Sequence, residues 1–283
     1  MTISTKSWSI IDLINWGTNH FSEKGIENAR REMEWLLCNV LQYERIDLYL
    51  KHENVLKAKE LEQLRSMIKR RVVGEPFQHI IGKAPFYGRD FIVNTNVLIP
   101  RPETGVLIDR LKENGKVSSL LDVGTGSGCI AITCALENLS EMIYATDISL
   151  DALEVARENM NLHKIKKIQA GYHDFLNSGF KSRFDVIISN PPYIGKDEME
   201  NLPAEVRDYD PELSLTDGAD GYLFYRRFAN AFDELINHDG YMLLEIAGGS
   251  HKDAVEIIFS EAGLTSIYFK DLQGDFRVVE VRK

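Results

Sequence analysis

The residue types best suited to chemistry stand in the stretch IISNPPYIG, where Asn190, Pro191, Pro192 and Tyr193 follow an apolar run. Each proline holds the preceding residue extended and lacks an N–H donor, so this loop is stiff and rich in acceptor oxygens. The side-chain oxygen of Asn190 and the carbonyl of Pro191 can accept both hydrogens of a planar NH2 group, while Tyr193 packs on its face. Such a loop suits alkylation of an amide or aromatic amine nitrogen with no metal and no covalent nucleophile. A strand that ends in a stiff turn fits the same residues.

A second candidate site is the stretch LLDVGTGSGC, in which Gly124, Gly126 and Gly128 follow a strand pattern and open a helical one. Glycines there let the backbone turn tightly and approach a ligand, and the start of the helix offers free N–H donors. Asp147 comes 23 residues after Gly124, at the end of the next predicted strand, where a carboxylate can bind ribose hydroxyls. Its alternative role is to cap the following helix, which Ser149 can also do. We therefore predict a nucleoside cofactor, although the glycine spacing departs from the dinucleotide fingerprint.

The elements around both loops alternate between strands and helices. Apolar runs separated by helical patterns predict strands at residues 120–123, 143–145, 186–188 and 241–246. Alternating βα units imply an α/β fold with a mostly parallel, Rossmann-like sheet. Asn190 then lies at the carboxyl end of a strand, where open α/β sheets place their ligands.

The amino-terminal part has a different texture. In residues 1–75 apolar residues recur at helical spacing, as in IENARREMEWLLCNVLQ, which predicts a small bundle with one helix ahead of Gly17. Residues 76–98 are rich in Gly, Pro and aromatic residues and predict a β-hairpin linker, with strands near residues 91–93 and 97–99. Residues 99–283 complete the α/β domain.

Charge and composition exclude several classes of protein. Residues 1–75 carry 12 Lys and Arg against 11 Asp and Glu, whereas the remainder carries 21 against 32. This acidic body disfavours a protein that grips nucleic-acid phosphates. No apolar run is long enough to span a membrane and no signal peptide is recognisable, so we expect a cytoplasmic protein. The scattered Cys38, Cys129 and Cys134 predict apolar packing rather than disulfides or zinc.

Both candidate sites resemble motifs of one enzyme class. LLDVGTGSGC resembles the first motif of S-adenosylmethionine (SAM) dependent methyltransferases, and the Asn-Pro-Pro-Tyr segment resembles their motif for methylating exocyclic or amide nitrogens. That second motif is shared by enzymes acting on adenine and cytosine in DNA, guanine in RNA and glutamine in protein. It indicates the reaction type and leaves the substrate open.

Three further stretches, GEPFQHIIGKAPFYG, VLIPRPETG and NLPAEVRDYDPELSLTDGADGYLFYRR, resemble signatures of release-factor glutamine methyltransferases of the HemK/PrmC type. The resemblance implies methyl transfer from SAM to the side-chain amide of the glutamine in a Gly-Gly-Gln motif of peptide chain release factors. It also implies a helical domain that docks this protein substrate, and no nucleic-acid or membrane partner. Cofactor binding is carried over to Gly124, Thr125, Gly126, Ser127, Gly128, Asp147, Phe175 and Asn190, and substrate binding to Asn190, Pro191, Pro192 and Tyr193.

Some features leave alternatives open. Phe175 can be a core residue instead of a neighbour of the adenine, and the sequence assigns no role to Arg101, Glu103, Glu205 or Arg207. Gly105, Ala247 and Ser250 depart from the residues that the family often carries there. The competing functions are a DNA or RNA base methyltransferase and a SAM-binding interaction protein without catalysis.

Overall fold

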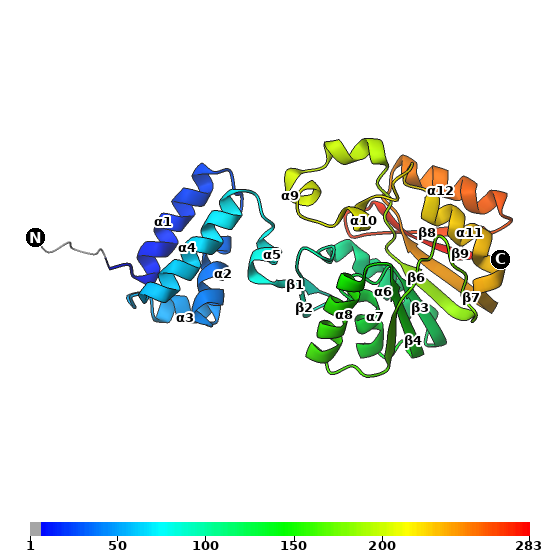
Figure 1. Ribbon diagram of the computed structural model, residues 1–283, viewed down its shortest axis with the longest axis horizontal. Helices are drawn as coiled ribbons and strands as arrows, with labels where there is room; N and C mark the ends of the chain where they lie inside the picture. The colour runs from blue at the N-terminus through cyan, green and yellow to red at the C-terminus, as the bar shows by residue number, and fades with distance from the viewer. Residues whose placement is uncertain (1–6) are drawn as a thin grey trace, which may run out of the picture. The chain divides into compact units, whose positions relative to one another are not determined.

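The computed structural model describes residues 7–283, and the chain divides into two compact units, with the first ending at Ile81 and the second beginning at Gly82 (Figure 1). The first unit is built from helices that enclose an apolar core of their own. Its helices are α1 (Ile10–Glu23), α2 (Ala29–Leu41), α3 (Arg45–Leu50), α4 (Ala58–Val72) and α5 (Phe77–Ile81).

Helix α1 does not end before Gly17 as its composition suggests, but continues through it to Glu23. A Cβ atom added at Gly17 would lie 2.3 Å from the sulfur of Met33 on α2. The glycine therefore allows α1 and α2 to approach closely, and this contact outweighs the cost of glycine inside a helix.

The second unit contains a seven-stranded sheet in the order β5-β4-β3-β6-β7-β9-β8. All neighbouring strands are parallel except those that pair with β9. The predicted Rossmann-like α/β class is thus confirmed, and the four predicted strands fall on β3, β4, β6 and β7. The strands are β3 (Val117–Val123), β4 (Ser140–Asp147), β5 (Ile168–Tyr172), β6 (Phe184–Ser189), β7 (Ile236–Glu245), β8 (Thr265–Lys270) and β9 (Phe276–Arg282).

The chain runs from β3 outward to β5 and then returns to place β6 beside β3. This reversal of strand order opens a crevice at the carboxyl ends of β3 and β6, which is where doubly wound sheets bind ligands. Both candidate loops follow these two strands, so the topology alone brings them together.

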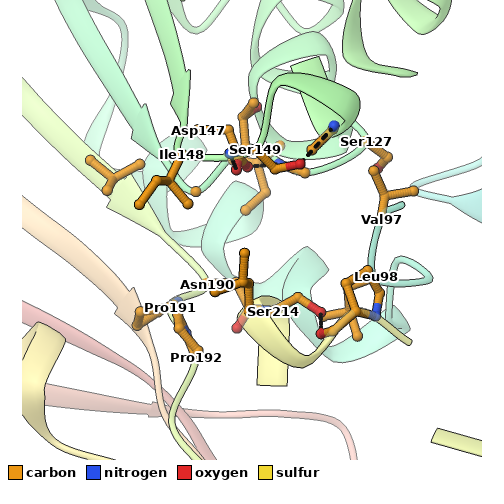
Figure 2. A pocket seen from close by; sticks show the side chains of 18 of the residues that line it. Val97, Leu98, Ser127, Asp147, Ile148, Ser149, Asn190, Pro191, Pro192 and Ser214 are labelled. Carbon is orange, nitrogen blue, oxygen red and sulfur yellow. Dashed lines mark hydrogen bonds between the residues drawn. The ribbon is translucent and has the colours of Figure 1, made fainter. Parts of the chain in front are cut away.

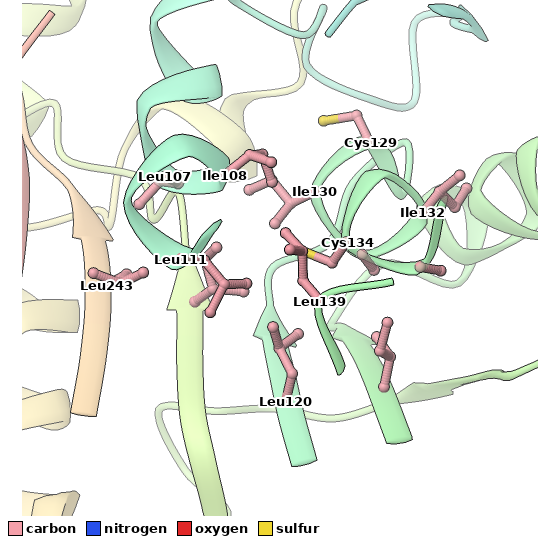
Figure 3. Close-up of a cluster of buried hydrophobic side chains, with 14 of the residues drawn as sticks. Leu107, Ile108, Leu111, Leu120, Cys129, Ile130, Ile132, Cys134, Leu139 and Leu243 are labelled. Carbon is pink, nitrogen blue, oxygen red and sulfur yellow. The ribbon is translucent and has the colours of Figure 1, made fainter. Parts of the chain in front are cut away.

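Helices cover both faces of the sheet. On one face, α6 (Gly105–Asn114), α7 (Cys129–Leu136) and α8 (Leu150–Leu162) contribute to the first apolar cluster. Figure 3 shows Ile108 of α6 beside Ile130 of α7, with Leu120 of β3 below and Leu243 of β7 to the left of Leu111. On the other face, α11 (Leu223–Leu235) and α12 (Ser250–Glu261) enclose the second cluster. All three cysteines are free and packed in apolar surroundings, as predicted.

The hairpin pairs β1 (Lys83–Phe86) with β2 (Arg89–Ile92), and its turn places both Tyr87 and Gly88 at positive φ. The strand expected at residues 97–99 is wrong, because this segment is not paired with any strand of the described chain. Val97 and Ile99 are instead buried in a small cluster with Ala152 of α8. Packing on a helix thus produced the apolar alternation that resembles a strand.

Short helical turns complete the second unit around the crevice. They are η1 (Pro102–Thr104), η2 (Lys196–Asn201), α9 (Ala204–Arg207) and α10 (Glu212–Leu215). Among residues 7–283, no helix is long and apolar enough to cross a membrane.

Candidate active site

A cavity of about 1120 Å³, including its opening to solvent, lies at the carboxyl ends of β3, β4 and β6. Figure 2 shows Ser127, Asp147 and Ser149 on one side of an open space, with Asn190 and Pro191 on the other. The predicted residues that line it are Gly124, Thr125, Gly126, Ser127, Asp147, Phe175, Asn190, Pro191 and Pro192; Gly128 and Tyr193 are not among the lining residues of the described chain.

The three glycines of the loop have two different tasks. All have positive φ, which L side chains rarely adopt. A Cβ atom added at Gly124 or Gly126 would meet nothing within 4 Å, so the backbone there borders open space. A Cβ atom at Gly128 would lie 3.0 Å from Ile132 and 3.3 Å from Ala156 of α8. The first two glycines therefore admit a ligand, whereas Gly128 allows α7 and α8 to pack.

Asp147 is tied to the glycine loop and still has acceptor capacity. Its Oδ2 accepts from the N–H of Gly126 and its Oδ1 from the N–H of Ser149, both at 2.9 Å. Ser149 is the residue that caps α8, by accepting from the N–H of Ala152. Burial raises the pKa of Asp147, while the backbone hydrogen bonds oppose that rise. An ionised carboxylate has about four acceptor sites, so two remain for the hydroxyls of a ribose.

Asp122 supports the glycine loop from below. Its Oδ2 accepts from the Thr125 hydroxyl at 2.7 Å and from the N–H of Ala131 at 3.2 Å. Complete burial raises the pKa of Asp122 to about 7. The loop is therefore held by a side chain that does not line the cavity.

Phe175 is both a core residue and part of the cavity wall. The residue is 4% exposed and its ring centroid lies 4.4 Å from that of Phe228 in the second apolar cluster, yet it also lines the cavity. The preceding His173 and Asp174 line the cavity as well. Leu176 lines it too, so the motif HDFL contributes four adjacent wall residues, of which the sequence indicated one.

Asn190 follows β6 directly, and Ser189 anchors the end of that strand by donating to the carbonyl of Val123 at 2.7 Å. The Asn190 Nδ2 donates to Thr104 Oγ1 at 3.3 Å, which leaves the amide oxygen to accept from another donor. Pro191 is buried, so its position is set by packing.

Tyr193 turns away from the cavity into an aromatic group. Its ring centroid lies 5.9 Å from that of His251, which stacks on Tyr222 at 4.7 Å. Burial, followed by the charge of Glu245, raises the pKa of Tyr193. The ring packs with the second apolar cluster, so in this structure it supports the loop from behind.

Two further segments, to whose residues the sequence assigned no role at the cavity, complete the wall. Arg101 lines the cavity and forms a 2.9 Å ion pair with Asp210, and burial raises the pKa of Asp210 to about 6. Arg207 pairs with Asp208 at 2.8 Å. The other wall residues that sequence reasoning missed include Val97, Leu98, Thr104, Ile148, Leu213, Ser214 and Phe224.

The positions that depart from the family pattern lie outside the wall. Gly105, Ala247 and Ser250 are not among the lining residues of the described chain. Within residues 7–283, no group of three or more His, Cys, Asp or Glu side chains is arranged to hold a metal ion. The side chains that line the cavity include two carboxylates, Asp147 and Asp174, and two amides, Asn96 and Asn190.

These residues fit a nucleoside cofactor such as SAM. Open space beside Gly124 and Gly126 admits a ligand against the backbone, and Asp147 retains free acceptors for a ribose. Together with the strand order, this arrangement defines a SAM-dependent methyltransferase of the Rossmann-like class. Residues 102–205 match the methyltransferase small domain, and residues 12–82 match the PrmC N-terminal domain.

Whole-chain comparisons narrow the class to a family. The chain is 35% identical over 283 residues to the release factor glutamine methyltransferase of Geobacter sulfurreducens, covering 99% of this chain and 98% of that protein. It is 41% identical over 254 residues to that of Chlorobaculum tepidum, with 85% and 86% covered. A methyltransferase structure from Pyrococcus furiosus matches in fold, with TM-score 0.50 and 17% identity over 78% of this chain and 96% of that one. The chain belongs to the release factor glutamine methyltransferase family, and its cofactor is SAM.

Proposed function

We propose that this protein methylates the side-chain amide nitrogen of the glutamine in the Gly-Gly-Gln motif of peptide chain release factors. The observation that carries the proposal is the hydrogen bond from Asn190 Nδ2 to Thr104 Oγ1, which leaves the amide oxygen as an acceptor beside the donor-free Pro191 and Pro192. A carboxamide offers two N–H donors in one plane, and this loop offers two acceptors. The whole-chain similarity to release factor glutamine methyltransferases supports the choice of a protein amide.

The proposed roles divide along the cavity. Asp147 accepts from the ribose hydroxyls of SAM, Phe175 packs beside its adenine, and the loop from Gly124 to Ser127 forms the floor beneath it, while Gly128 lets the helices behind that loop pack. Asn190 and Pro191 accept the two amide hydrogens of the substrate, and Tyr193 with Pro192 shapes that end of the loop.

The chemistry requires orientation more than acid–base catalysis. When bound, SAM supplies a methyl group on a positively charged sulfur. An amide nitrogen is a poor nucleophile because its lone pair is delocalised into the carbonyl. Two acceptors fix the direction of the nitrogen and increase its partial negative charge, so Asn190 and Pro191 act by positioning and electrostatics.

We also propose that the helical unit up to Ile81 docks the protein substrate. Its own apolar core lets it present a formed surface, and Trp16, Trp35 and Leu50 are among its exposed large apolar side chains. Removing this unit should raise KM for a whole release factor and leave KM for a short Gly-Gly-Gln peptide unchanged. Equal KM values for the whole factor would contradict the docking role.

The direct test incubates the protein with methyl-labelled SAM and one of three acceptors: a release factor, the same factor with its Gly-Gly-Gln glutamine changed to alanine, or nucleic acid. We expect label on the first acceptor only, at the amide nitrogen by mass spectrometry. Equal label on the alanine variant refutes the proposed residue. Label on nucleic acid supports base methylation instead, and no label with intact SAM binding supports a non-catalytic protein.

A further inference from the structure

Asn190 can hold its amide in two orientations that differ by a half-turn, and only one of them offers an acceptor to the substrate. With Oδ1 toward the substrate the loop accepts an N–H, whereas with Nδ2 in that place it repels one. A threonine hydroxyl does not discriminate between the two, because it both donates and accepts. The hydrogen bond to Thr104 therefore leaves open what determines the orientation of Asn190.

Glu245 lies where it can determine the orientation of the Asn190 side-chain amide. Strands β6 and β7 are parallel and in register with Ser189 opposite Leu244, so the next residues, Asn190 and Glu245, are neighbours at the ends of adjacent strands. Because side chains alternate along a strand, both project to the face covered by α6. Thr104 precedes α6 directly, and both Thr104 and Glu245 are only 2% exposed.

The carboxyl of Glu245 is buried among groups with opposing effects on its charge, and it is ionised above about pH 7. Burial raises the pKa of Glu245 to about 7, the charge of Glu103 adds to the rise, and hydrogen bonding from Thr104 and Tyr193 together with the charge of Arg277 opposes it. The guanidinium of Arg277 is itself held by Asp271 at 3.0 Å. Ionised Glu245 can accept but not donate, so a hydroxyl facing it must donate its single proton there.

This buried carboxyl has no evident structural purpose. Within residues 7–283, Glu245 Oε2 has no hydrogen-bond partner, although buried polar atoms are normally paired. An incompletely satisfied carboxyl lowers stability, and such groups concentrate at functional sites. By contrast, the equally buried Glu280 is paired with Arg110 and Arg282.

We propose that Glu245 is a positioning residue that acts through Thr104. Its carboxylate accepts a hydrogen bond from the Thr104 hydroxyl, so that Thr104 Oγ1 is left to accept from Asn190 Nδ2 and Asn190 Oδ1 turns toward the substrate amide. The inference rests on the proposed function for its substrate, and the hydrogen-bond direction itself is independent of which substrate is used.

The kinetic test compares Thr104→Val, Thr104→Ser and Glu245→Gln with the wild-type protein. Thr104→Val removes the hydroxyl at constant shape, and Glu245→Gln turns an acceptor into a group that can donate and so reverse the direction. We expect each to lower kcat about tenfold or more with the SAM Kd changed less than about twofold, while Thr104→Ser retains kcat. In the double variant of Thr104→Val and Glu245→Gln, kcat should be about as low as in the more impaired single variant, because both changes act on the same orientation of Asn190.

Two matched controls separate positioning from loss of packing. Thr133→Val removes a fully buried hydroxyl in α7 without a partner in the described chain, and Glu280→Gln changes a buried carboxyl on β9. Both should retain kcat, whatever their thermal stability. Wild-type kcat in Thr104→Val and Glu245→Gln, or multiplied losses in the double variant, would overturn the inference.

A second measurement needs no substrate. In selectively ¹⁵N-labelled protein, the side-chain amide of Asn190 is assigned by its disappearance in Asn190→Ala. We expect slow exchange of one amide proton in the wild type and in Thr104→Ser, and faster exchange in Thr104→Val and Glu245→Gln. Unchanged exchange in Thr104→Val and in Glu245→Gln would refute the proposed role of Glu245. This outcome does not depend on whether the protein methylates a release factor, so it is distinguishable from failure of the proposed function.

Discussion

Arg101 Nη2 lies 2.9 Å from Asp210 Oδ2, although 109 residues separate them in the chain. The Asp210 side chain is 1% exposed and that of Arg101 is 38% exposed. Arg101 lines the cavity, and Pro211, Leu213 and Ser214, which follow Asp210, line it too. The pair therefore ties together two wall segments that no local pattern connects.

Changing Arg101 to alanine should destabilise the protein in a pH-dependent way. Burial raises the pKa of Asp210 from 3.8 to about 6, so Asp210 is charged at pH 8 and largely protonated at pH 5. We expect a loss of roughly 1–2 kcal/mol at pH 8, below that of a fully buried pair, and a smaller loss at pH 5. Urea unfolding at both pH values measures it. The control is Arg207→Ala, because Arg207 pairs with the more exposed Asp208 and should change little; equal losses at both pH values would contradict the assignment.

Replacing Asn190 with alanine should abolish most turnover and spare the cofactor. The change removes an acceptor aimed at the substrate, so kcat should fall about a hundredfold or more, as for other preorganised polar groups. Calorimetric titration should give a SAM Kd within about threefold of the wild type. Normal turnover in this variant would refute the role of the loop.

Asp147→Ala should show the opposite pattern. Both carboxylate oxygens hold backbone N–H groups of the loop, and the remaining acceptors face the cavity. We expect the SAM Kd to rise about tenfold or more, with a smaller effect on kcat at saturating SAM. Asp151→Ala, an exposed change in the first turn of α8, is the matched control and should bind normally.

Alanine at Gly128 and at Gly124 should separate packing from binding. Both positions have positive φ, which costs an L residue roughly 1–2 kcal/mol. At Gly128 the new methyl also meets Ile132 at 3.0 Å, so Gly128→Ala should be the less stable variant in denaturant unfolding. At Gly124 the methyl enters open space beside the cavity. Relative to its loss of stability, Gly124→Ala should therefore lose more SAM affinity than Gly128→Ala does. Equal stability of the two would contradict this division.

The free energy of unfolding of Glu245→Gln, relative to that of the wild type, should increase as pH rises. The pKa of Glu245 is raised from 4.5 to about 7, so the folded state holds this proton more tightly than the unfolded chain. Wild-type stability therefore falls as pH rises from about 4.5 to 7, by up to roughly 3 kcal/mol from this group. The variant lacks that contribution, so its stability relative to wild type should be greater at pH 8 than at pH 5. A constant difference across this range would show that Glu245 has an ordinary pKa.

The sequence by itself determined the features that depend on local chemistry. Backbone geometry could be predicted from a few neighbouring residues at the glycines of LLDVGTGSGC, at the acid that ends the next strand and at the prolines after Asn190. Alternating strand and helix patterns determined the sheet class, because burial on two faces leaves periodic apolar runs. The strand order, which places β3 beside β6 and so brings both loops to one crevice, came from the structure.

Only the tertiary structure decided which residues surround those loops. The contacts of Thr104 with Asn190 and of Arg101 with Asp210 join residues far apart in the chain, as does the placement of Glu245. No sequence periodicity links such residues. Residues 97–99 were misassigned for a related reason, since contact with α8 and pairing in a sheet both bury alternate side chains. Local sequence specifies what a backbone can do, whereas the partners of a buried polar group depend on contacts across the fold, which are formed only when distant segments pack together.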